Sequence, residues 1–233
     1  MPANPICVAI DTPDLEHAVA LAKTLTPHVG WAKVGMEFFY AHGLQGYARV
    51  AETGLPIFLD LKLHDIPNTV ASAMKALLRI TPAPGIVNLH ATGGLDMMKA
   101  AAEAVDGRAK LIAVTILTSL SDDDIWAAGF ETARNTESHA RSLAELTKRA
   151  GLDGVVCSPH DLVGIRHDLG RDFLTVVPGI RPADAATQDQ KRVATPAAAL
   201  EAGADILVIG RAITGAAHPA QAAQDILGTL HGR

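Results

Sequence analysis

Short apolar runs rich in Val and Ile alternate with amphipathic segments along the whole chain, and this alternation constrains the fold most strongly. The runs lack a polar face, which is typical of strands that are covered on both sides. They recur about every 25 to 30 residues, which favours parallel strands joined by right-handed helical crossovers. About eight such strands predict an α/β fold, a closed (β/α)8 or TIM barrel. We expect residues 1–233 to form this barrel as a single domain.

The expected elements follow from the same pattern. Pro67 and Pro196 are placed to begin helices, because proline is tolerated in the first helical turn. Residues 120–136 are expected to form a capped extra helix in one lengthened loop, and residues 182–192 a mobile loop. The expected strands cover residues 6–11, 31–35, 57–63, 86–91, 111–117, 154–158, 174–180 and 205–210, and the expected helices include 15–25, 70–80 and 138–150.

An open doubly wound sheet is the structural alternative. Such a sheet usually has fewer strands at this length, and often a glycine-rich dinucleotide turn after its first strand. Here that strand ends in Asp11-Thr12-Pro13-Asp14, and the chain contains no Gly-Lys-Ser/Thr phosphate loop. Nucleotide cofactors bound by either motif therefore lose support.

Composition excludes several other classes of protein. A formal charge of −5 and a pI near 6.0 give no electrostatic footprint for nucleic acid or an anionic membrane. Cys7 and Cys157 lie in apolar runs without a second ligand at metal-binding spacing, so we interpret them as buried thiols. The first residues lack the basic and apolar regions of a signal peptide, and no apolar stretch is long enough to cross a bilayer. A cytoplasmic location is expected.

Charged residues gather at the ends of the first three expected strands. Asp11 closes the first, Lys33 lies in the second, and Asp60 and Lys62 lie near the end of the third. Strand alternation places Asp60 and Lys62 on one face, and Asp65 follows on the next loop. In a barrel of this kind the active site is built at these strand ends. The sequence therefore predicts a catalytic cluster there.

Such a cluster has two interpretations. It can be a structural ion-pair network that satisfies itself in the barrel mouth. Alternatively, flanking carboxylates can keep the Lys62 ammonium protonated and aim its proton at a developing carbanion. We favour the second, because this many charges at the functional end exceeds what structure alone requires. A magnesium site is disfavoured, because Lys62 already supplies a cation between Asp60 and Asp65. No metal is therefore predicted.

A second constellation, near the end of the chain, is typical of a phosphate site. Gly210 allows close approach of a ligand to the backbone, Arg211 offers a bidentate fork, and a helix is expected to begin there. The loop after the seventh strand supplies Arg181, and loops seven and eight are a frequent phosphate site in barrels. The alternative is a glycine turn with a solvent-facing arginine at each loop.

Two histidines lie near the cluster. His90 ends the fourth expected strand, where it can face a ligand or be a hydrogen-bonded residue at the barrel rim. His64 falls on the face opposite to Lys62 by alternation, so we interpret it as structural.

These motifs together resemble the orotidine 5′-phosphate decarboxylase family. The run from Asp60 to Thr69, DLKLHDIPNT, is similar to that family's signature, apart from Leu63, where an aromatic residue is common. The resemblance covers nearly the whole chain in the family's order. It includes residues 8–11, 33–35, 117–119, 177–181 and 209–211.

The resemblance implies a cofactor-free decarboxylation that converts orotidine 5′-phosphate to UMP, the last step of UMP synthesis. Lys62 would protonate C6 of the pyrimidine after carbon dioxide leaves, flanked by Asp60 and Asp65, and Lys33 would complete the charge array. Asp65 and Thr69 would come from the neighbouring subunit, which implies a functional homodimer.

The resemblance also implies the substrate contacts. Asp11 and Lys33 would bind ribose hydroxyls, and Thr118 would meet the pyrimidine. Arg211 and the Gly210 amide would hold the phosphate. The other implied contacts lie on the loop after the seventh strand: Pro178, Arg181 and Gln190, which would bridge base and phosphate.

Two rival functions remain at this point. One is a Mg²⁺-dependent sugar-phosphate decarboxylase or synthase of the same superfamily, which keeps the Asp-x-Lys-x-x-Asp core; residues 64–69, Thr118 and Gln190 favour a pyrimidine nucleotide instead. The other is a noncatalytic phosphate-binding barrel.

Overall fold

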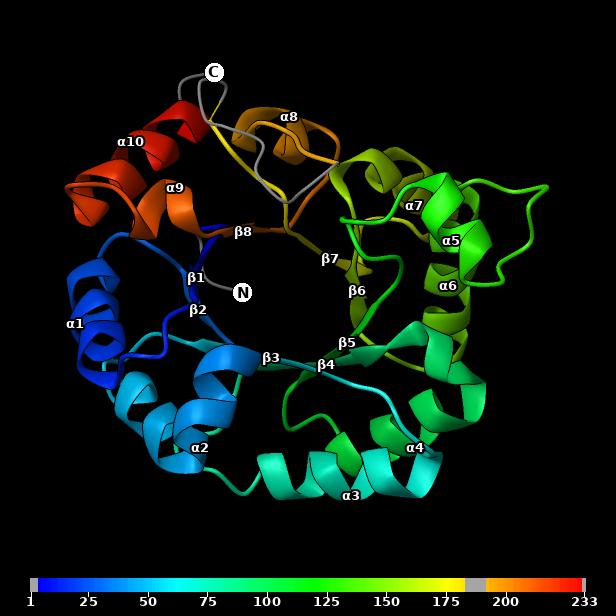
Figure 1. The fold of residues 1–233 in the computed structure, drawn as a ribbon, viewed down its shortest axis with the longest axis horizontal. Helices are drawn as coiled ribbons and strands as arrows, with labels where there is room; N and C mark the ends of the chain where they lie inside the picture. Colours follow the sequence, from blue (N-terminus) through cyan, green and yellow to red (C-terminus); the bar gives the residue numbers. More distant parts are fainter. Residues whose placement is uncertain (1–3, 183–191, 232–233) are drawn as a thin grey trace.

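The computed structural model describes residues 4–182 and 192–231. Eight parallel strands close into a barrel in sequence order, and β1 pairs with β8 to complete it (Figure 1). The predicted (β/α)8 fold is confirmed. The strands are β1 (Ile6–Ile10), β2 (Trp31–Gly35), β3 (Ile57–Leu63), β4 (Ile86–His90), β5 (Lys110–Val114), β6 (Gly154–Val156), β7 (Leu174–Val177) and β8 (Ile206–Ile209).

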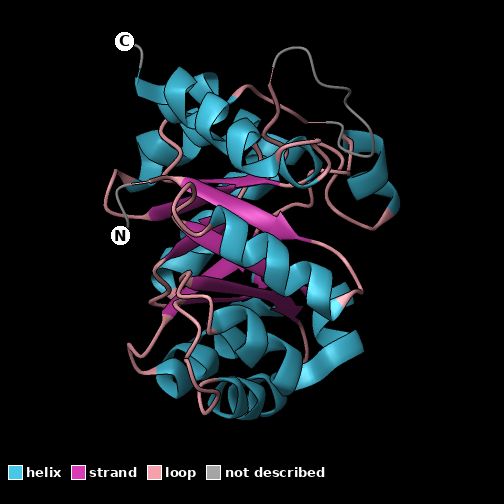
Figure 2. Ribbon diagram, turned by 90° about the vertical axis from the view of Figure 1, so that its left-hand side faces the viewer, coloured by secondary structure: helices cyan, strands magenta, loops and turns pink. Residues whose placement is uncertain are grey.

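Helices form the outer ring and cover the barrel on all sides (Figure 2). The ring contains α1 (Leu15–Leu25), α2 (Met36–Ala51), α3 (Pro67–Leu77), α4 (Gly94–Val105), α5 (Asp122–Ala127), α6 (Thr136–Arg149), α7 (Leu162–Leu169), α8 (Pro196–Glu201), α9 (Arg211–Thr214) and α10 (Pro219–His231). Short 3₁₀ turns, η1 (Ala91–Gly93) and η2 (Pro159–Asp161), precede α4 and α7.

The core has two layers because the strands are covered on both faces. Along β1, Cys7 and Ala9 point into the barrel, whereas Val8 and Ile10 pack against the helices. Inside, Trp31 and Phe58 join the small side chains, so the barrel interior is packed rather than hollow. Both cysteines are buried free thiols, as expected.

Most predicted boundaries agree within a few residues. Helices α3 and α8 begin at Pro67 and Pro196, and Ser121 caps α5 through a reciprocal capping box with Asp124. The extra helix differs most, because α5 covers only Asp122–Ala127 of the expected 120–136. Among the strands, β5 stops at Val114 rather than at residue 117, and β7 at Val177 rather than at residue 180. Apolar residues continue past the last ladder bond in both places, so composition alone misplaced the ends.

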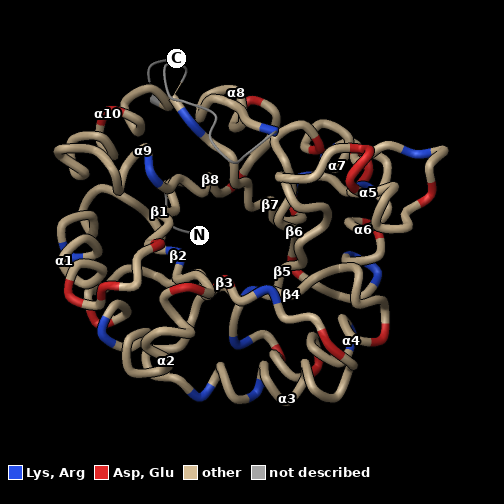
Figure 3. The backbone as a smooth tube through the Cα atoms, viewed as in Figure 1, with Lys and Arg blue, Asp and Glu red and all other residues tan. Residues whose placement is uncertain are grey.

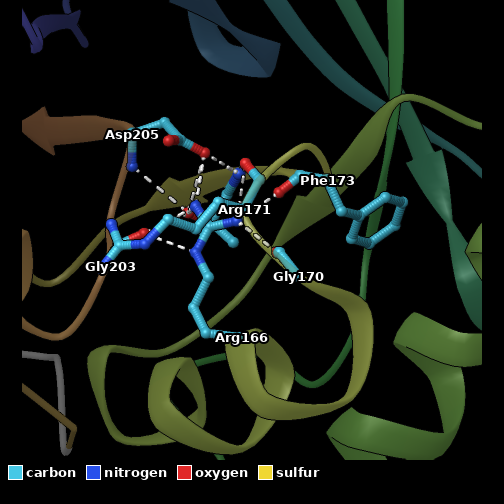
Figure 4. Close-up of polar contacts among 7 residues, drawn as sticks. Arg166, Gly170, Arg171, Phe173, Gly203 and Asp205 are labelled. Carbon is cyan, nitrogen blue, oxygen red and sulfur yellow. Dashed lines mark hydrogen bonds and ion pairs between the residues drawn. The ribbon is translucent and has the colours of Figure 1, made fainter.

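An arginine ties together the N-terminal end of the barrel. The Arg166 guanidinium, on α7, donates to the carbonyl oxygens of Phe173 and Gly203 at 2.6 Å each. It also donates to Thr175 Oγ1 at 2.7 Å and pairs with Asp205 Oδ2 at 2.6 Å. Figure 4 shows Arg166 at the centre of these contacts. The segments before β7 and β8 are thus fixed to one helix. These contacts lie at the end of the barrel opposite to the C-terminal ends of the strands.

Charges of both signs are interspersed around the ring of helices (Figure 3). In the part of the chain that the structure describes, no helix combines the length and apolar character that a membrane span requires.

Candidate active site

Four charged side chains form an alternating array at the C-terminal ends of β1, β2 and β3. Lys33 Nζ lies 2.9 Å from Asp11 Oδ1 and 3.4 Å from Asp60 Oδ2. Lys62 Nζ lies 2.7 Å from the other Asp60 oxygen, Oδ1. Asp60 therefore stands between two ammonium groups. The side chains of Lys33 and Asp60 are 11% and 9% exposed, whereas that of Lys62 is 25% exposed, so Lys62 is the array's more open cation.

The backbone around Lys62 departs from a regular strand. Its φ is 51°, in the left-handed region that a non-glycine residue occupies at a cost of about 1–3 kcal/mol. The β3–β4 ladder shifts register between Leu59 and Leu63, so Lys62 lies in a bulge. Regular alternation is therefore not what brings Lys62 to Asp60. The predicted contact between Asp60 and Lys62 is present, but the bulge rather than regular strand alternation brings the two side chains together.

The close packing at β2 also favours the array. A Cβ atom on Gly35 would lie 3.0 Å from Lys33 Nζ and 3.2 Å from Asp11 Oδ1. Glycine at this position leaves the space that the ion pair occupies.

The electrostatics keep the central groups charged. Burial would raise the pKa of Asp60, but the ammonium groups of Lys33 and Lys62 outweigh burial and hold that pKa below its ordinary value. Burial would lower the pKa of Lys33, but Asp60 and Asp11 reverse this and raise it above the ordinary value. A buried carboxylate between two cations is therefore present as the anion at neutral pH.

The array lies at the edge of a cavity of about 950 Å³ at the C-terminal end of the barrel. Its volume is in the range of small-molecule sites. Most residues that the sequence singled out line this cavity: Asp11, Lys33, Asp60, Lys62, Thr118, Pro178, Arg181, Gly210 and Arg211.

Three predicted site residues are not among those that line the cavity. Asp65 and Thr69 lie in an exposed run that spans residues 64–69, and the Asp65 carboxylate accepts a hydrogen bond from the Ile66 amide at 2.7 Å. Gln190 lies outside the described residues. Within one chain, Lys62 thus has Asp60 as its carboxylate partner, while Asp65 is exposed and does not line the cavity.

The far side of the cavity is formed by the loops after β7 and β8. Helix α9 begins at Arg211, directly after Gly210, so its first amides lie beside the end of β8. The loop after β7 is held by residue 194: the Arg181 amide donates to the Ala194 carbonyl, and the Ala194 amide to the Gly179 carbonyl, at 3.0 and 3.2 Å. Two arginines and helix-terminal amides across the cavity from Lys62 suit an anionic group.

Sequence reasoning missed Asn88. Its side chain is 1% exposed and hydrogen-bonded to both Asp60 and the Lys62 backbone. An amide in the middle of the apolar run IVNLH was the available signal. It also missed Met36, Ser119 and Cys157, which line the cavity but carry no charge pattern.

The two histidines lie together. The rings of His64 and His90 are 5.5 Å apart. Burial lowers the pKa of His90 most, and the nearby His64 and Lys62 lower it further. The His90 ring is therefore neutral at neutral pH. Neither ring is among the cavity-lining groups. Across residues 4–182 and 192–231, no three His, Cys, Asp or Glu side chains cluster as metal ligands would.

The closed parallel barrel with a charged pocket at its C-terminal end defines the class of (β/α)8-barrel enzymes. Within that class, residues 4–226 match the model of the orotidine 5′-phosphate decarboxylase / HUMPS family. The chain belongs to this family.

Relatives and solved structures agree with this membership. The chain is 51% identical to the orotidine 5′-phosphate decarboxylase of Rhodospirillum rubrum, covering 100% of this chain and 96% of the relative. It is 51% identical to that of Novosphingobium aromaticivorans, covering 98% and 100%. The crystal structure of orotidine 5′-phosphate decarboxylase from Lactobacillus acidophilus superposes with a TM-score of 0.84 at 37% identity, covering 98% of this chain and 100% of that one.

Proposed function

We propose that this protein decarboxylates orotidine 5′-phosphate to UMP without a cofactor, with Lys62 as the proton donor. The observation that carries the proposal is the pairing of Lys62 Nζ with the buried Asp60 carboxylate at 2.7 Å, at the edge of a cavity that also contains Arg181 and Arg211. Family membership over residues 4–226 supports the substrate.

The reaction breaks the bond between C6 of the pyrimidine and the carboxylate carbon. Carbon dioxide leaves, and the bonding electron pair stays on C6 as a carbanion. The Lys62 ammonium then gives its proton to C6, which forms UMP, and the resulting amine recovers a proton from water. A preorganised cation stabilises the developing charge most strongly where water is excluded. Asp60 holds the Lys62 ammonium in place, and three quarters of the Lys62 side chain is already buried.

The rest of the cavity suits the nucleotide. Arg211 and the Gly210 amide bind the phosphate, together with Pro178 and Arg181 on the loop after β7. Asp11 and Lys33 bind ribose hydroxyls, and Thr118 contacts the base. Gln190, outside the described residues, is assigned the bridge between base and phosphate. Phosphate contacts far from C6 supply binding energy that helps to hold the reacting carbon against Lys62.

We further propose that the functional unit is a homodimer in which Asp65 and Thr69 reach the partner's cavity. Support comes from the exposed run 64–69, which includes Ile66 at 67% exposure. Tyr40 and Leu44, four residues apart on α2, are 74% and 55% exposed. Exposed apolar side chains that gather into one patch are typical of an interface. The partner's Asp65 would then complete the alternating array on the open side of Lys62.

The proposal extends to organisation and location. Residues 1–233 act as one barrel domain, which is supported by the β1–β8 pairing that joins the two ends of the chain in one sheet. The protein works in the cytoplasm, where its anionic nucleotides are retained because ions do not cross lipid readily.

The test is a direct assay on the purified chain. Decarboxylation of orotidine 5′-phosphate, followed as loss of absorbance, should proceed unchanged in the presence of EDTA. A Mg²⁺-dependent sugar-phosphate enzyme of the same superfamily would instead lose its turnover of a sugar phosphate under chelation. Absence of turnover with the nucleotide would refute the proposal, and UMP binding without turnover would favour a noncatalytic barrel.

A further inference from the structure

Asn88 joins the two central members of the charge array from the neighbouring strand. Its Nδ2 donates to Asp60 Oδ1 at 2.7 Å, and its Oδ1 accepts the backbone N–H of Lys62 at 2.8 Å. The side chain is 1% exposed and does not line the cavity. Both polar ends of one buried amide are therefore used on residues of the array.

The backbone explains why an amide is needed there. From Leu59 to Leu63 the β3 strand advances four residues, while its partners on β4, Val87 and Leu89, are two apart. The extra residues leave the bulged segment outside the regular ladder. Lys62, at φ 51°, lies in this segment, and its N–H is satisfied by the Asn88 side chain instead of a β4 carbonyl.

We infer that Asn88 is a positioning residue that sets the geometry of the proton donor, through the Lys62 backbone on one side and the Asp60 carboxylate on the other. The inference rests on the proposed decarboxylation for its kinetic consequence. An amide nitrogen only donates, so Asn88 favours the ionised carboxylate. Asp60 Oδ1 thus receives Lys62 Nζ and Asn88 Nδ2, while Oδ2 faces Lys33. The carboxylate is fixed on both oxygens.

A purely structural role predicts something different. If Asn88 only satisfied buried polar groups, its replacement would lower stability but leave the kinetics of folded protein unchanged. Thr147 provides the matched control, because it is fully buried and its hydroxyl donates to the Leu143 carbonyl at 2.7 Å, on α6 and away from the cavity. Thr147→Val removes a buried hydrogen bond without touching the array.

The first comparison uses Asn88→Ala, Thr147→Val and the unmodified protein. In Asn88→Ala we expect kcat to fall on the order of 100-fold, because misplacing a reacting group by about 1 Å costs that much. KM for orotidine 5′-phosphate should stay within about threefold, because the phosphate and ribose contacts do not involve Asn88. Thr147→Val should keep both constants. A kcat for folded Asn88→Ala equal to that of Thr147→Val would overturn the inference.

Asn88→Asp tests the same role in a variant of nearly the same shape, which protects the test if Asn88→Ala does not fold. Its carboxylate can still accept the Lys62 N–H but meets Asp60 as a second anion. Two adjacent carboxyl groups share a proton, which raises the pKa of the pair. Activity needs ionised Asp60. In a plot of kcat against pH, the fall on the acid side should therefore move to higher pH by more than about one unit. An unmoved acid limb would count against the role.

Other charged or titratable groups also face Asp60, and they are the same in the variant and in the unmodified protein. The shift is therefore assigned from the difference between the two pH profiles. These groups are Lys33 on β2, Lys62 on β3, His90 on β4, Cys7 on β1, and Asp11 after β1.

A structural readout separates this inference from the proposed function. In a crystal structure of Asn88→Ala, Lys62 should leave the left-handed region and its Nζ should no longer lie within hydrogen-bond distance of Asp60 Oδ1. Both features should persist in Thr147→Val. Retention of both in Asn88→Ala would overturn the inference even if the unmodified protein showed no turnover. Loss of both with an inactive unmodified protein would overturn only the proposed reaction.

Discussion

Lys62 is the more exposed of the two lysines that pair with Asp60 and line the cavity. Its Nζ touches Asp60, yet a quarter of the side chain is exposed. Lys33 has two carboxylate partners and is more deeply buried. A proton donor must reach the substrate, so the geometry distinguishes the two lysines although their residue type does not.

Replacement of Lys62 by Ala should therefore abolish turnover selectively. We expect kcat to fall by at least about 10²–10⁴-fold, the contribution typical of a positioned proton donor. UMP binding, measured by calorimetry, should persist because the residues proposed to hold the phosphate are on the opposite loops. Lys23→Ala, in the exposed last turn of α1, is the control and should behave as the unmodified protein. Turnover of Lys62→Ala at the unmodified rate would rule out the proton-donor role.

Asp60 should also link stability to pH. Its pKa is lowered in the fold, so the unfolded chain binds its proton at a higher pH than the folded chain does. The contribution is complete above about pH 3.9, the unfolded value, and is lost as the pH falls toward the lower folded value. In urea titrations, the gap in unfolding free energy between the unmodified protein and Asp60→Asn should narrow below about pH 4. A constant gap would contradict this.

The sequence predicted the charged residues of this site better than the residues that hold them in position. Asp11, Lys33, Asp60, Lys62 and Arg211 were identifiable because charges at the ends of buried strands are rare and the motif is specific. The supports depend on geometry that the sequence does not encode locally. Asn88 matters because two residues are inserted opposite it on β3. A register shift between strands that are distant in sequence has no local signature.

At the level of elements, the two ends of the barrel have separate tasks. The C-terminal ends carry the charge array and the cavity, whereas the N-terminal end is held by networks such as that of Arg166. The alternation of strands and helices predicted this layout, because the apolar pattern of a buried strand followed by an amphipathic helix recurs along the whole chain. It did not predict where β5 and β7 end, since apolar residues continue there beyond the ladder.

Arg166→Lys should destabilise the fold without changing catalysis. Lysine cannot reproduce the fork that reaches two carbonyl oxygens, Thr175 and Asp205 at once. We expect the free energy of unfolding, measured with urea, to fall by about 3 kcal/mol, as for loss of hydrogen bonds to a charged group. The matched control is Arg49→Lys in the exposed pair with Glu16, where a change below about 1 kcal/mol is expected. Equal losses in the two variants would contradict the central role of Arg166.

At the scale of the whole molecule, one chain leaves the array open on one side. Lys62 has a carboxylate on its buried side, and Asp65 lies outside the cavity of its own chain. The run 64–69 with Ile66 is exposed, and so are Tyr40 and Leu44 on α2, which supports the proposed packing of a second copy. A symmetric dimer uses the same patch on both subunits, so a run that reaches the cavity of one partner is matched by the same contact at the other cavity.

The assignment of Asp65 to the partner's site is tested by mixing subunits. Lys62→Ala and Asp65→Ala homodimers should each be nearly inactive. After exchange, mixed dimers contain one site with Lys62 from one chain and Asp65 from the other, so random mixing should restore about a quarter of full activity. Lys62→Ala mixed with Asp60→Asn is the control, because both residues belong to the same chain's cavity and no mixed dimer regains a complete site. Differently tagged subunits show whether exchange has occurred. If the subunits exchange but the first mixture recovers no activity, Asp65 does not belong to the partner's site.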